Sequence, residues 1–315
     1  MYCPRLDHFV RFNFNGTVSR CGHMVSAPQF NSLEDMDASD WLQNIKSTFE
    51  QDIFPRECQR CQQTEEINGT SIRLNATNFD QHQIKKDYLT VGGVLDNVCN
   101  SACFTCSPEL STKIGSLYSN IYPIVDNADR FWRLPMHRVV HLDINGGEPS
   151  ASKNYRYLLQ NIPDNVKSVR INTNCSVIIP EIEELLNRNI KITVTVSLDG
   201  IESVHDFVRW PIKWSKFYKN LMTYKNMPGL ELNTWTTVSA LNIGDFKNIL
   251  AFVNEHGIDH SYALLHNPDV LSVKYINSFT LEHQEVIPGQ VAVGKNNQTD
   301  IDAFMIKQKH LRGVV

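Results

Sequence analysis

The chain has 315 residues, of which 42% are hydrophobic, and a formal net charge of −4. This length and composition are sufficient for a large buried core, and we expect one large domain accompanied by a small one. The near-neutral charge argues against nucleic acid as a partner, because a nucleic-acid-binding surface is strongly basic. The lack of a long uninterrupted apolar run argues against a membrane span.

The N-terminal segment up to Cys61 contains four of the eight cysteines. Cys58 and Cys61 form a C-x2-C pair, and Cys3 and Cys21 complete a set of four thiols. Four thiolates bind either a zinc ion or a 4Fe-4S cluster, so the residues alone leave both open.

A disulfide framework is the other interpretation of an even number of cysteines, and N-x-S/T sequons are compatible with secretion. The sequons begin at Asn15, Asn68, Asn75, Asn174 and Asn297. The N-terminus, however, has no basic segment leading into an apolar stretch, as a secretory signal would. We therefore expect a protein of a reducing compartment, the cytoplasm.

Three further cysteines, Cys99, Cys103 and Cys106, form a C-x3-C-x2-C triad directly after a strand-like segment. Three thiolates leave one iron of a 4Fe-4S cluster free to bind a substrate or cosubstrate. A zinc site short of one ligand and three buried thiols are the alternatives. The close spacing of the three cysteines favours the cluster.

From Tyr88 onward, strand-like and helix-like segments alternate, which is typical of βα units around a parallel sheet. We expect strands at Tyr88 to Leu95, Arg138 to Ile144, Ser168 to Asn172, Lys191 to Leu198, Leu230 to Ser239, and either Tyr262 to Leu265 or Val270 to Tyr275. We expect helices at Pro180 to Arg188, at Phe246 to Val253 with Gly257 as terminator, and at Asp300 to Leu311.

Polar and glycine-containing motifs follow three of these expected strands. They are Gly146-Gly147-Glu148-Pro149, Asn172-Thr173-Asn174 and Val196-Ser197-Leu198-Asp199-Gly200. Taken alone, Gly146-Gly147 and Asp199-Gly200 have a structural explanation as turns, and Ser197 as ordinary alternation along a strand. Arg209 alone has a structural explanation as a surface cation. Because the carboxyl ends of parallel strands converge, the order of the motifs favours one common active site.

The triad followed by these motifs resembles the radical S-adenosylmethionine (SAM) enzymes. More narrowly, the chain is similar to the twitch-domain members, related to the SPASM type, of phages and environmental bacteria, and the resemblance covers nearly the whole chain. For a phage-encoded protein, the expected cytoplasm would be that of the host. It implies a catalytic 4Fe-4S cluster on Cys99, Cys103 and Cys106, and a second, auxiliary 4Fe-4S cluster on Cys3, Cys21, Cys58 and Cys61. It implies SAM contacts from Gly146, Gly147, Glu148, Pro149, Asn174, Ser197, Asp199 and Arg209.

The resemblance also assigns parts of SAM to these motifs. The amino group is expected at the GGEP motif and the ribose near Asn174 and Ser197. The carboxylate is expected near Asp199 and Arg209, where a guanidinium suits it.

The fold that the resemblance implies is α/β, a partial (β/α)6 TIM-like barrel with a small N-terminal iron-sulfur subdomain. We expect residues 1–77 to form the twitch-like auxiliary domain and residues 78–87 a linker. Residues 88–285 would form the barrel, and residues 286–315 a tail with a helix that covers it.

The chain departs from the family pattern at two positions within the motifs. The family usually has an aromatic residue directly before the third cysteine, but here Thr105 stands there and Phe104 precedes it. Glycine commonly follows the Thr-Asn pair, whereas here Cys175 follows Asn174. We expect Cys175 to be a small buried hydrophobe, with a ligand or hydrogen-atom donor as the alternative.

The expected function is reductive cleavage of SAM to a 5'-deoxyadenosyl radical that abstracts hydrogen from a substrate. Twitch and SPASM relatives mostly modify peptides or proteins, which makes a peptide the leading substrate class; a nucleotide, sugar or small metabolite is the alternative. An electron donor such as flavodoxin or ferredoxin would be a partner. From another class, the chain would be a non-catalytic iron-sulfur or zinc protein for binding or electron transfer.

Overall fold

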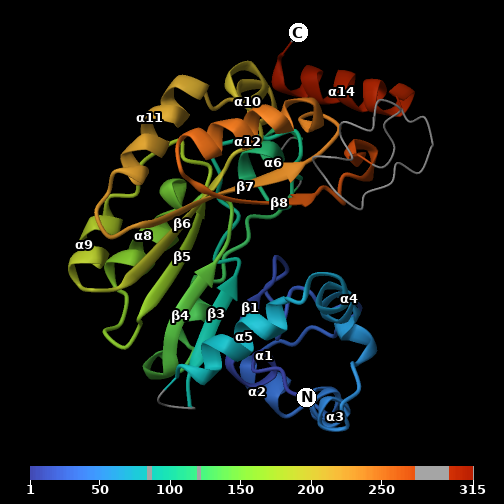
Figure 1. The fold of residues 1–315 in the computed structure, drawn as a ribbon, viewed down its shortest axis with the longest axis vertical. Helices are drawn as coiled ribbons and strands as arrows, with labels where there is room; N and C mark the ends of the chain where they lie inside the picture. Colours follow the sequence, from blue (N-terminus) through green and yellow to red (C-terminus); the bar gives the residue numbers. More distant parts are fainter. Residues whose placement is uncertain (84–86, 119–121, 274–297, 315) are drawn as a thin grey trace. The chain divides into compact units, whose positions relative to one another are not determined.

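The computed structural model describes residues 1–83, 87–118, 122–273 and 298–314, and Figure 1 shows their ribbon. The strands are β1 (Phe9–Phe12), β2 (Val18–Ser19), β3 (Leu89–Gly93), β4 (Val139–Ile144), β5 (Ser168–Thr173), β6 (Lys191–Ser197), β7 (Glu231–Val238) and β8 (Asp259–Leu264). They form one sheet of eight strands in the order β2-β1-β3-β4-β5-β6-β7-β8. Strands β1 and β2 are antiparallel, whereas β1 and β3, β3 and β4, β6 and β7, and β7 and β8 pair in parallel. The predicted α/β class, with a mostly parallel sheet, is confirmed, and a (β/α)6 barrel stays a prediction.

The α-helices of the described residues are α1 (Arg5–His8), α2 (Leu33–Asp37), α3 (Asp40–Glu50), α4 (Gln59–Asn68), α5 (Ile72–Gln81), α6 (Thr112–Leu117), α7 (Ala128–Trp132), α8 (Lys153–Gln160), α9 (Glu181–Asn187), α10 (Glu202–Val208), α11 (Trp214–Lys225), α12 (Phe246–Glu255) and α14 (Gln298–Arg312). Short 3-10 turns are η1 (Arg56–Cys58), η2 (Met136–Arg138), η3 (Pro149–Ala151), η4 (Ile243–Asp245) and η5 (Asp269–Leu271). None of these helices combines the length and the apolar character that crossing a membrane requires.

The predicted strands from Tyr88 onward correspond to β3 through β8, with ends that differ by a few residues. For the last strand, β8 matches the first alternative, Tyr262 to Leu265, but begins earlier, at Asp259. The second alternative begins as the turn η5, and its end at Tyr275 lies outside the described residues. Helices α9, α12 and α14 match the three predicted helices, and Gly257 follows α12 with a φ of +58°.

The described chain divides into two compact units. The first contains Met1–Asp96, Val125–Gly146 and Asn161–Val169. The second contains Asn97–Ile124, Gly147–Gln160 and the described residues from Arg170 onward. Helix α5 extends to Gln81, so the first residues of the predicted linker are helical. The predicted domain boundaries at residues 77 and 87 stay predictions, and the boundary at residue 285 lies outside the described residues.

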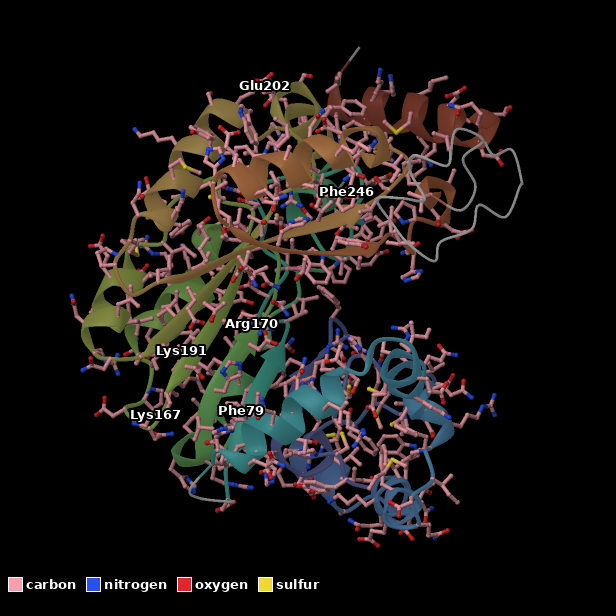
Figure 2. The ribbon with its side chains drawn as sticks, in the orientation of Figure 1. Phe79, Lys167, Arg170, Lys191, Glu202 and Phe246 are labelled. Atoms are coloured by element: carbon pink, nitrogen blue, oxygen red, sulfur yellow. The ribbon has the colours of Figure 1, made fainter. Side chains whose placement is uncertain are left out.

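The first unit contains a strand that the sequence pattern did not predict. Strand β1 pairs in parallel with β3, with Val10 opposite Val91, and both side chains are fully buried. Phe79, labelled in Figure 2, lies on α5 and contacts the rings of Tyr88 and His141. A separate core of the same unit consists of Cys3, Leu6, Leu42, Ile45, Phe49 and Cys58. Cys3 and Cys58 therefore belong to this core.

In the second unit, strand β6 shows the alternation that a half-buried strand requires. Ile192, Val194 and Val196 are fully buried, whereas the intervening Thr193, Thr195 and Ser197 are partly exposed. The buried face packs with α9, whose residues Ile182 and Leu185 are also buried. Because β6 ends at Ser197, the residues that follow it form the loop at the carboxyl end of the strand.

Candidate functional site

The loop that contains the cysteine triad is held by hydrogen bonds within the second unit. The amide of Ala102 donates to the carbonyl of Trp210 at 2.8 Å, and the amide of Phe104 donates to that of Val208 at 3.0 Å. Ser111, the N-cap of α6, donates its hydroxyl to the carbonyl of Ser101 at 2.8 Å. The loop thus has a defined backbone although it is not a regular element.

The three thiols lie close enough to influence one another. Ser101 Oγ is 3.3 Å from Cys99 Sγ and 3.5 Å from Cys103 Sγ, so one hydroxyl joins two of the cysteines. Burial, together with the neighbouring Cys103 and Cys99, raises the pKa of the Cys106 thiol to about 12. Burial and the adjacent Cys103 also raise the pKa of Cys99. Such a group of thiols needs a positive partner before it can ionise.

Gly147 of the GGEP motif allows the loop after β4 to approach the segment before the triad. A Cβ atom at Gly147 would clash with the carbonyl oxygen of Val98. The next amide, that of Glu148, donates to the same carbonyl at 2.7 Å. The absence of a side chain at Gly147 therefore permits the close approach of the loop after β4 to the segment before the triad. Gly146, which directly follows Asn145, is partly buried, and Pro149 is buried at the first position of η3.

The carboxylate of Glu148 is buried and joins the loops that follow β4 and β5. Glu148 Oε1 accepts from the Ser150 amide at 3.1 Å, the Ser150 hydroxyl at 2.7 Å and the Thr173 hydroxyl at 2.7 Å. Oε2 accepts from the Asn174 amide at 2.6 Å. Burial raises the pKa of Glu148, and these hydrogen bonds oppose that shift. Glu148 thus links the loop after β4 to the end of β5.

Asn174 extends this network to the triad loop. Its Nδ2 donates to Asn100 Oδ1 at 2.8 Å and to Ser101 Oγ at 3.3 Å. Asn100 in turn donates to Ser176 Oγ at 2.9 Å. Asn174 is only 4% exposed, so the predicted residue is engaged within the protein. The loops after β4 and β5 and the triad loop therefore form one hydrogen-bonded group.

Asp199 and Arg209 form a buried ion pair after β6. Arg209 NH1 donates to Asp199 Oδ2 at 3.0 Å, and Asp199 Oδ1 accepts from the Thr237 amide at 2.8 Å. Burial works against the charge of Arg209, but its acidic neighbours raise its pKa above the usual value. These neighbours are Cys103, Asp199 and Cys99, in decreasing order of effect. The charge of the guanidinium is therefore coupled to the thiols of the triad as well as to Asp199.

One nitrogen of this guanidinium has no partner. Arg209 Nε is buried and makes no hydrogen bond to any atom of the described residues. A buried N–H without an acceptor is costly, and a ligand carboxylate would satisfy it. Ser197, at the end of β6, is partly exposed.

Cys175 lies in the loop after β5 and is fully buried. Its φ is +59°, a left-handed conformation that favours the glycine common at this place in the family that the motifs resemble. Its Sγ lies 3.9 Å from the carbonyl oxygen of Phe217, and burial raises the pKa of the thiol. Cys175 therefore occupies a core position as a small, protonated side chain.

In the first unit, the four N-terminal cysteines line one cavity. Cys3, Cys21, Cys58 and Cys61 face it together with Arg5 and Arg73. Figure 2 shows several sulfur atoms between the segments drawn in blue. Burial raises the pKa of Cys3 to about 12 and also raises that of Cys58, and in both cases Cys21 and Cys61 add to the shift. The structure thus brings the four predicted thiols together.

In neither set do the cysteine side chains lie at metal-binding distances from a common point. Among the described residues, no group of three or more His, Cys, Asp or Glu side chains has an arrangement that would hold a metal ion. The donor sets nevertheless fit iron-sulfur clusters chemically, because each consists of thiols alone. The four N-terminal thiols also line one cavity. In the second unit, the unpartnered Arg209 Nε adds a feature that fits a carboxylate ligand.

Three polar residues that the sequence analysis missed complete the site. Asn100 and Ser101 lie between the first two cysteines of the triad and contact Asn174. Asn242 is 1% exposed and donates to the carbonyls of Asp199 and Thr237, both at 3.1 Å. The position of Asn100 and Ser101 inside the triad was a usable signal. No comparable signal marks Asn242.

Comparison with solved structures finds low overall similarity. SuiB of Streptococcus suis bound to S-adenosylmethionine is 17% identical with a TM-score of 0.44, over 86% of this chain and 60% of that one. SuiB bound to precursor peptide SuiA is 17% identical with a TM-score of 0.43, over 77% and 51%. Native anSMEcpe with bound AdoMet is 17% identical with a TM-score of 0.42, over 71% and 62%. The chain thus spans about half to three-fifths of these proteins.

No protein-family model matches the chain, and no curated protein matches it. With identities of 17% and TM-scores below 0.5, the similar structures do not assign a function.

Proposed function

We propose that the chain is a radical SAM enzyme whose second unit binds a 4Fe-4S cluster through Cys99, Cys103 and Cys106. The observation that carries this proposal is Arg209, a largely buried cation whose charge is coupled to the thiols of Cys99 and Cys103 and whose buried Nε–H has no acceptor among the described residues. A thiol triad and a carboxylate-binding group at one place match the two needs of SAM chelation. A zinc site or a group of buried thiols would not require the arginine.

Each residue of the site has a role in this proposal that suits its chemistry. Cys99, Cys103 and Cys106 would hold the cluster, which would supply the electron for reductive cleavage of SAM. Arg209 would bind the SAM carboxylate through Nε while Asp199 holds its NH1 group. Glu148 and Asn174 keep the loops after β4 and β5 against the triad loop. Ser197 would face the ribose, and Gly146, Gly147 and Pro149 would shape the pocket for the amino group.

For the first unit, we propose an auxiliary 4Fe-4S cluster on Cys3, Cys21, Cys58 and Cys61. The shared cavity and the all-thiol donor set support it. With four thiolates on four irons, that cluster would have no open iron for a substrate, which favours a role in electron transfer. A small redox protein of the flavodoxin or ferredoxin type would be the electron donor.

For the substrate, we propose a peptide or protein. The support is the resemblance of the motifs to twitch and SPASM enzymes, which mostly modify peptides. SuiB has been solved with its precursor peptide and anSMEcpe with a Kp18Cys peptide, so peptides are the first class to assay. A nucleotide, sugar or small metabolite is the alternative.

The test is formation of 5'-deoxyadenosine by the anaerobically reconstituted protein with SAM and a strong reductant. Wild type is compared with a variant in which Cys99, Cys103 and Cys106 are all alanine. We expect cleavage by wild type only, with iron falling from roughly eight to roughly four per chain, as two cubes require. Equal iron in both proteins, with no cleavage in either, would overturn the proposal in favour of a binding or electron-transfer protein.

A further inference from the structure

The C-terminal helix α14 places a buried arginine against the backbone of the triad loop. Arg312, at the end of α14, is only 6% exposed. Its Nε donates to the carbonyl of Ala102 at 2.8 Å, and its NH2 donates to the carbonyl of Cys103 at 3.3 Å. One guanidinium thus satisfies two adjacent carbonyl groups between the first and third cysteines of the triad.

Arg312 is itself held in place. Its NH1 donates to the carbonyl of Gln308 at 3.1 Å and to Gln308 Oε1 at 2.6 Å. Gln308 Nε2 donates to the hydroxyl of Tyr118 at 3.0 Å. The guanidinium carbon also lies 4.4 Å from the ring centroid of Phe104, which stacks on Phe207. Because every branch of the guanidinium has a partner, its position relative to the loop is fixed before any ligand binds.

The two N–H donors of Arg312 that bind the loop, Nε and NH2, and its positive charge have separate effects. We call the two donors the fork. The fork holds two carbonyls at one distance from each other, which a lysine ammonium cannot reproduce. The charge lies within hydrogen-bond distance of the Cys103 backbone, and its effect is only weakly screened because the group is buried. A reduced cluster carries one more negative charge than an oxidised one. A fixed cation nearby therefore stabilises the reduced form and raises the reduction potential.

We propose that Arg312 is a positioning residue that fixes the triad loop at Ala102 and Cys103 and raises the reduction potential of the cluster bound there. The proposal rests on the proposed function, because it requires a cluster on the triad. It gives the C-terminal helix a role in the chemistry of a loop that lies about two hundred residues earlier in the chain.

The experiment compares wild type, Arg312→Gln and Arg312→Lys in the full-length, anaerobically reconstituted protein. The triad cluster is identified as the electron paramagnetic resonance signal that SAM changes and that the triple alanine variant lacks. Its midpoint potential is obtained by redox titration. We expect a lower potential in Arg312→Gln and an unchanged potential in Arg312→Lys, because lysine keeps the charge. We expect both variants to lose iron from the triad faster than wild type during anaerobic dialysis against a chelator, because neither keeps the fork.

Two further variants make the comparison specific. Lys307→Gln removes a charge from an exposed position of the same helix and should change neither the potential nor the iron loss. Gln308→Glu has a side chain of the same size beside Arg312, but its carboxylate offsets the positive charge of Arg312. We therefore expect this variant to lower the potential. Gln308→Glu decides the role of the charge if Arg312→Gln does not fold.

A wild-type potential in both Arg312→Gln and Gln308→Glu would overturn the role of the charge. Wild-type iron retention in both Arg312 variants would overturn the role of the fork. Failure of the proposed function is distinguishable, since wild type itself would then lack the SAM-sensitive signal. In that case the proposed effect of the Arg312 charge on the potential fails as well. The positioning of the loop by the Arg312 donors is then tested in metal-free protein, by amide hydrogen exchange at Ala102 and Phe104. Exchange there should be faster in Arg312→Gln than in wild type, and equal exchange would overturn the positioning role.

Discussion

Arg209 NH1 donates to Asp199 Oδ2 at 3.0 Å, and this ion pair has side-chain exposures of only 13% and 2%. Burial raises the pKa of Asp199, whereas the guanidinium lowers it. Neither charge is therefore tolerable without the other. The pair stabilises the loop after β6 and, in the proposed function, orients the unpartnered Nε for a ligand.

Arg209→Gln is expected to destabilise the protein and to weaken SAM binding. Removing one member of a buried ion pair costs about 3–5 kcal/mol, because the other charge stays buried. Losing a charge-assisted contact to the SAM carboxylate should weaken binding by about 10- to 100-fold. The measurements are the apparent Tm and equilibrium dialysis with labelled SAM on cluster-loaded protein.

The double variant Asp199→Asn, Arg209→Gln is the matched control for Arg209→Gln. It removes both charges, so we expect it to recover much of the stability but none of the SAM affinity. If the double variant bound SAM as wild type does, Arg209 would not be the carboxylate ligand. If Arg209→Gln were as stable as wild type, the ion pair would not be buried as described.

Gly147→Ala is expected to loosen the triad loop. The added Cβ would clash with the carbonyl of Val98, which must move. Such overpacking typically lowers the free energy of unfolding by about 1–3 kcal/mol. Because Val98 immediately precedes Cys99, we also expect lower iron content at the triad. Gly244→Ala is the control, since a Cβ there meets no atom within 4 Å. Equal iron and equal Tm in the two variants would show that the approach of these two loops does not matter.

The strand ends are the part of the site that the sequence predicted well. Strand β6 alternates in burial and ends at Ser197, so the place of Asp199 follows from periodicity alone. The convergence of such ends is a general property of parallel strands, which is why the motifs were expected together. Strand β1 was missed because its four residues, mostly buried, are too short to show a period.

Other features depend on contacts that no local pattern encodes. Arg312 meets Cys103 across 209 positions of the chain, and nothing near Arg312 in the sequence marks it as a loop-binding residue. The positive φ of Cys175 is likewise invisible in the sequence, because cysteine rarely adopts that conformation. Cavities such as the one lined by the four N-terminal cysteines depend on packing of several helices, although the number of thiols did indicate a common site.

Iron analysis should separate the structural cysteine from the proposed ligands. The double variant Cys58→Ala, Cys61→Ala is expected to lose roughly four irons per chain, the content of one cube. Cys175→Ala is the control, because Cys175 is fully buried in the second unit, and its loss should leave iron unchanged at a modest cost in stability. Iron and acid-labile sulfide are measured after anaerobic reconstitution. Wild-type iron in the first variant would contradict an auxiliary cluster, and iron loss in Cys175→Ala would make that residue a ligand.

His205→Phe is expected to make the protein less sensitive to acid. His205 is fully buried, its two ring nitrogens have no partner among the described residues, and burial together with Arg209 lowers its pKa to about 3. The pKa of His205 in the folded protein lies below the unfolded value of about 6.5, so the unfolded chain binds a proton more readily. The free energy of unfolding is therefore highest above about pH 6.5 and falls as the pH falls toward 3. Between pH 7 and pH 5 this linkage amounts to about 2 kcal/mol.

We expect the apparent Tm of His205→Phe to fall less over that pH interval than the apparent Tm of wild type. The control His310→Phe, at an exposed position, should behave as wild type does. Parallel Tm curves for wild type and His205→Phe would show that His205 does not stay neutral in the folded protein.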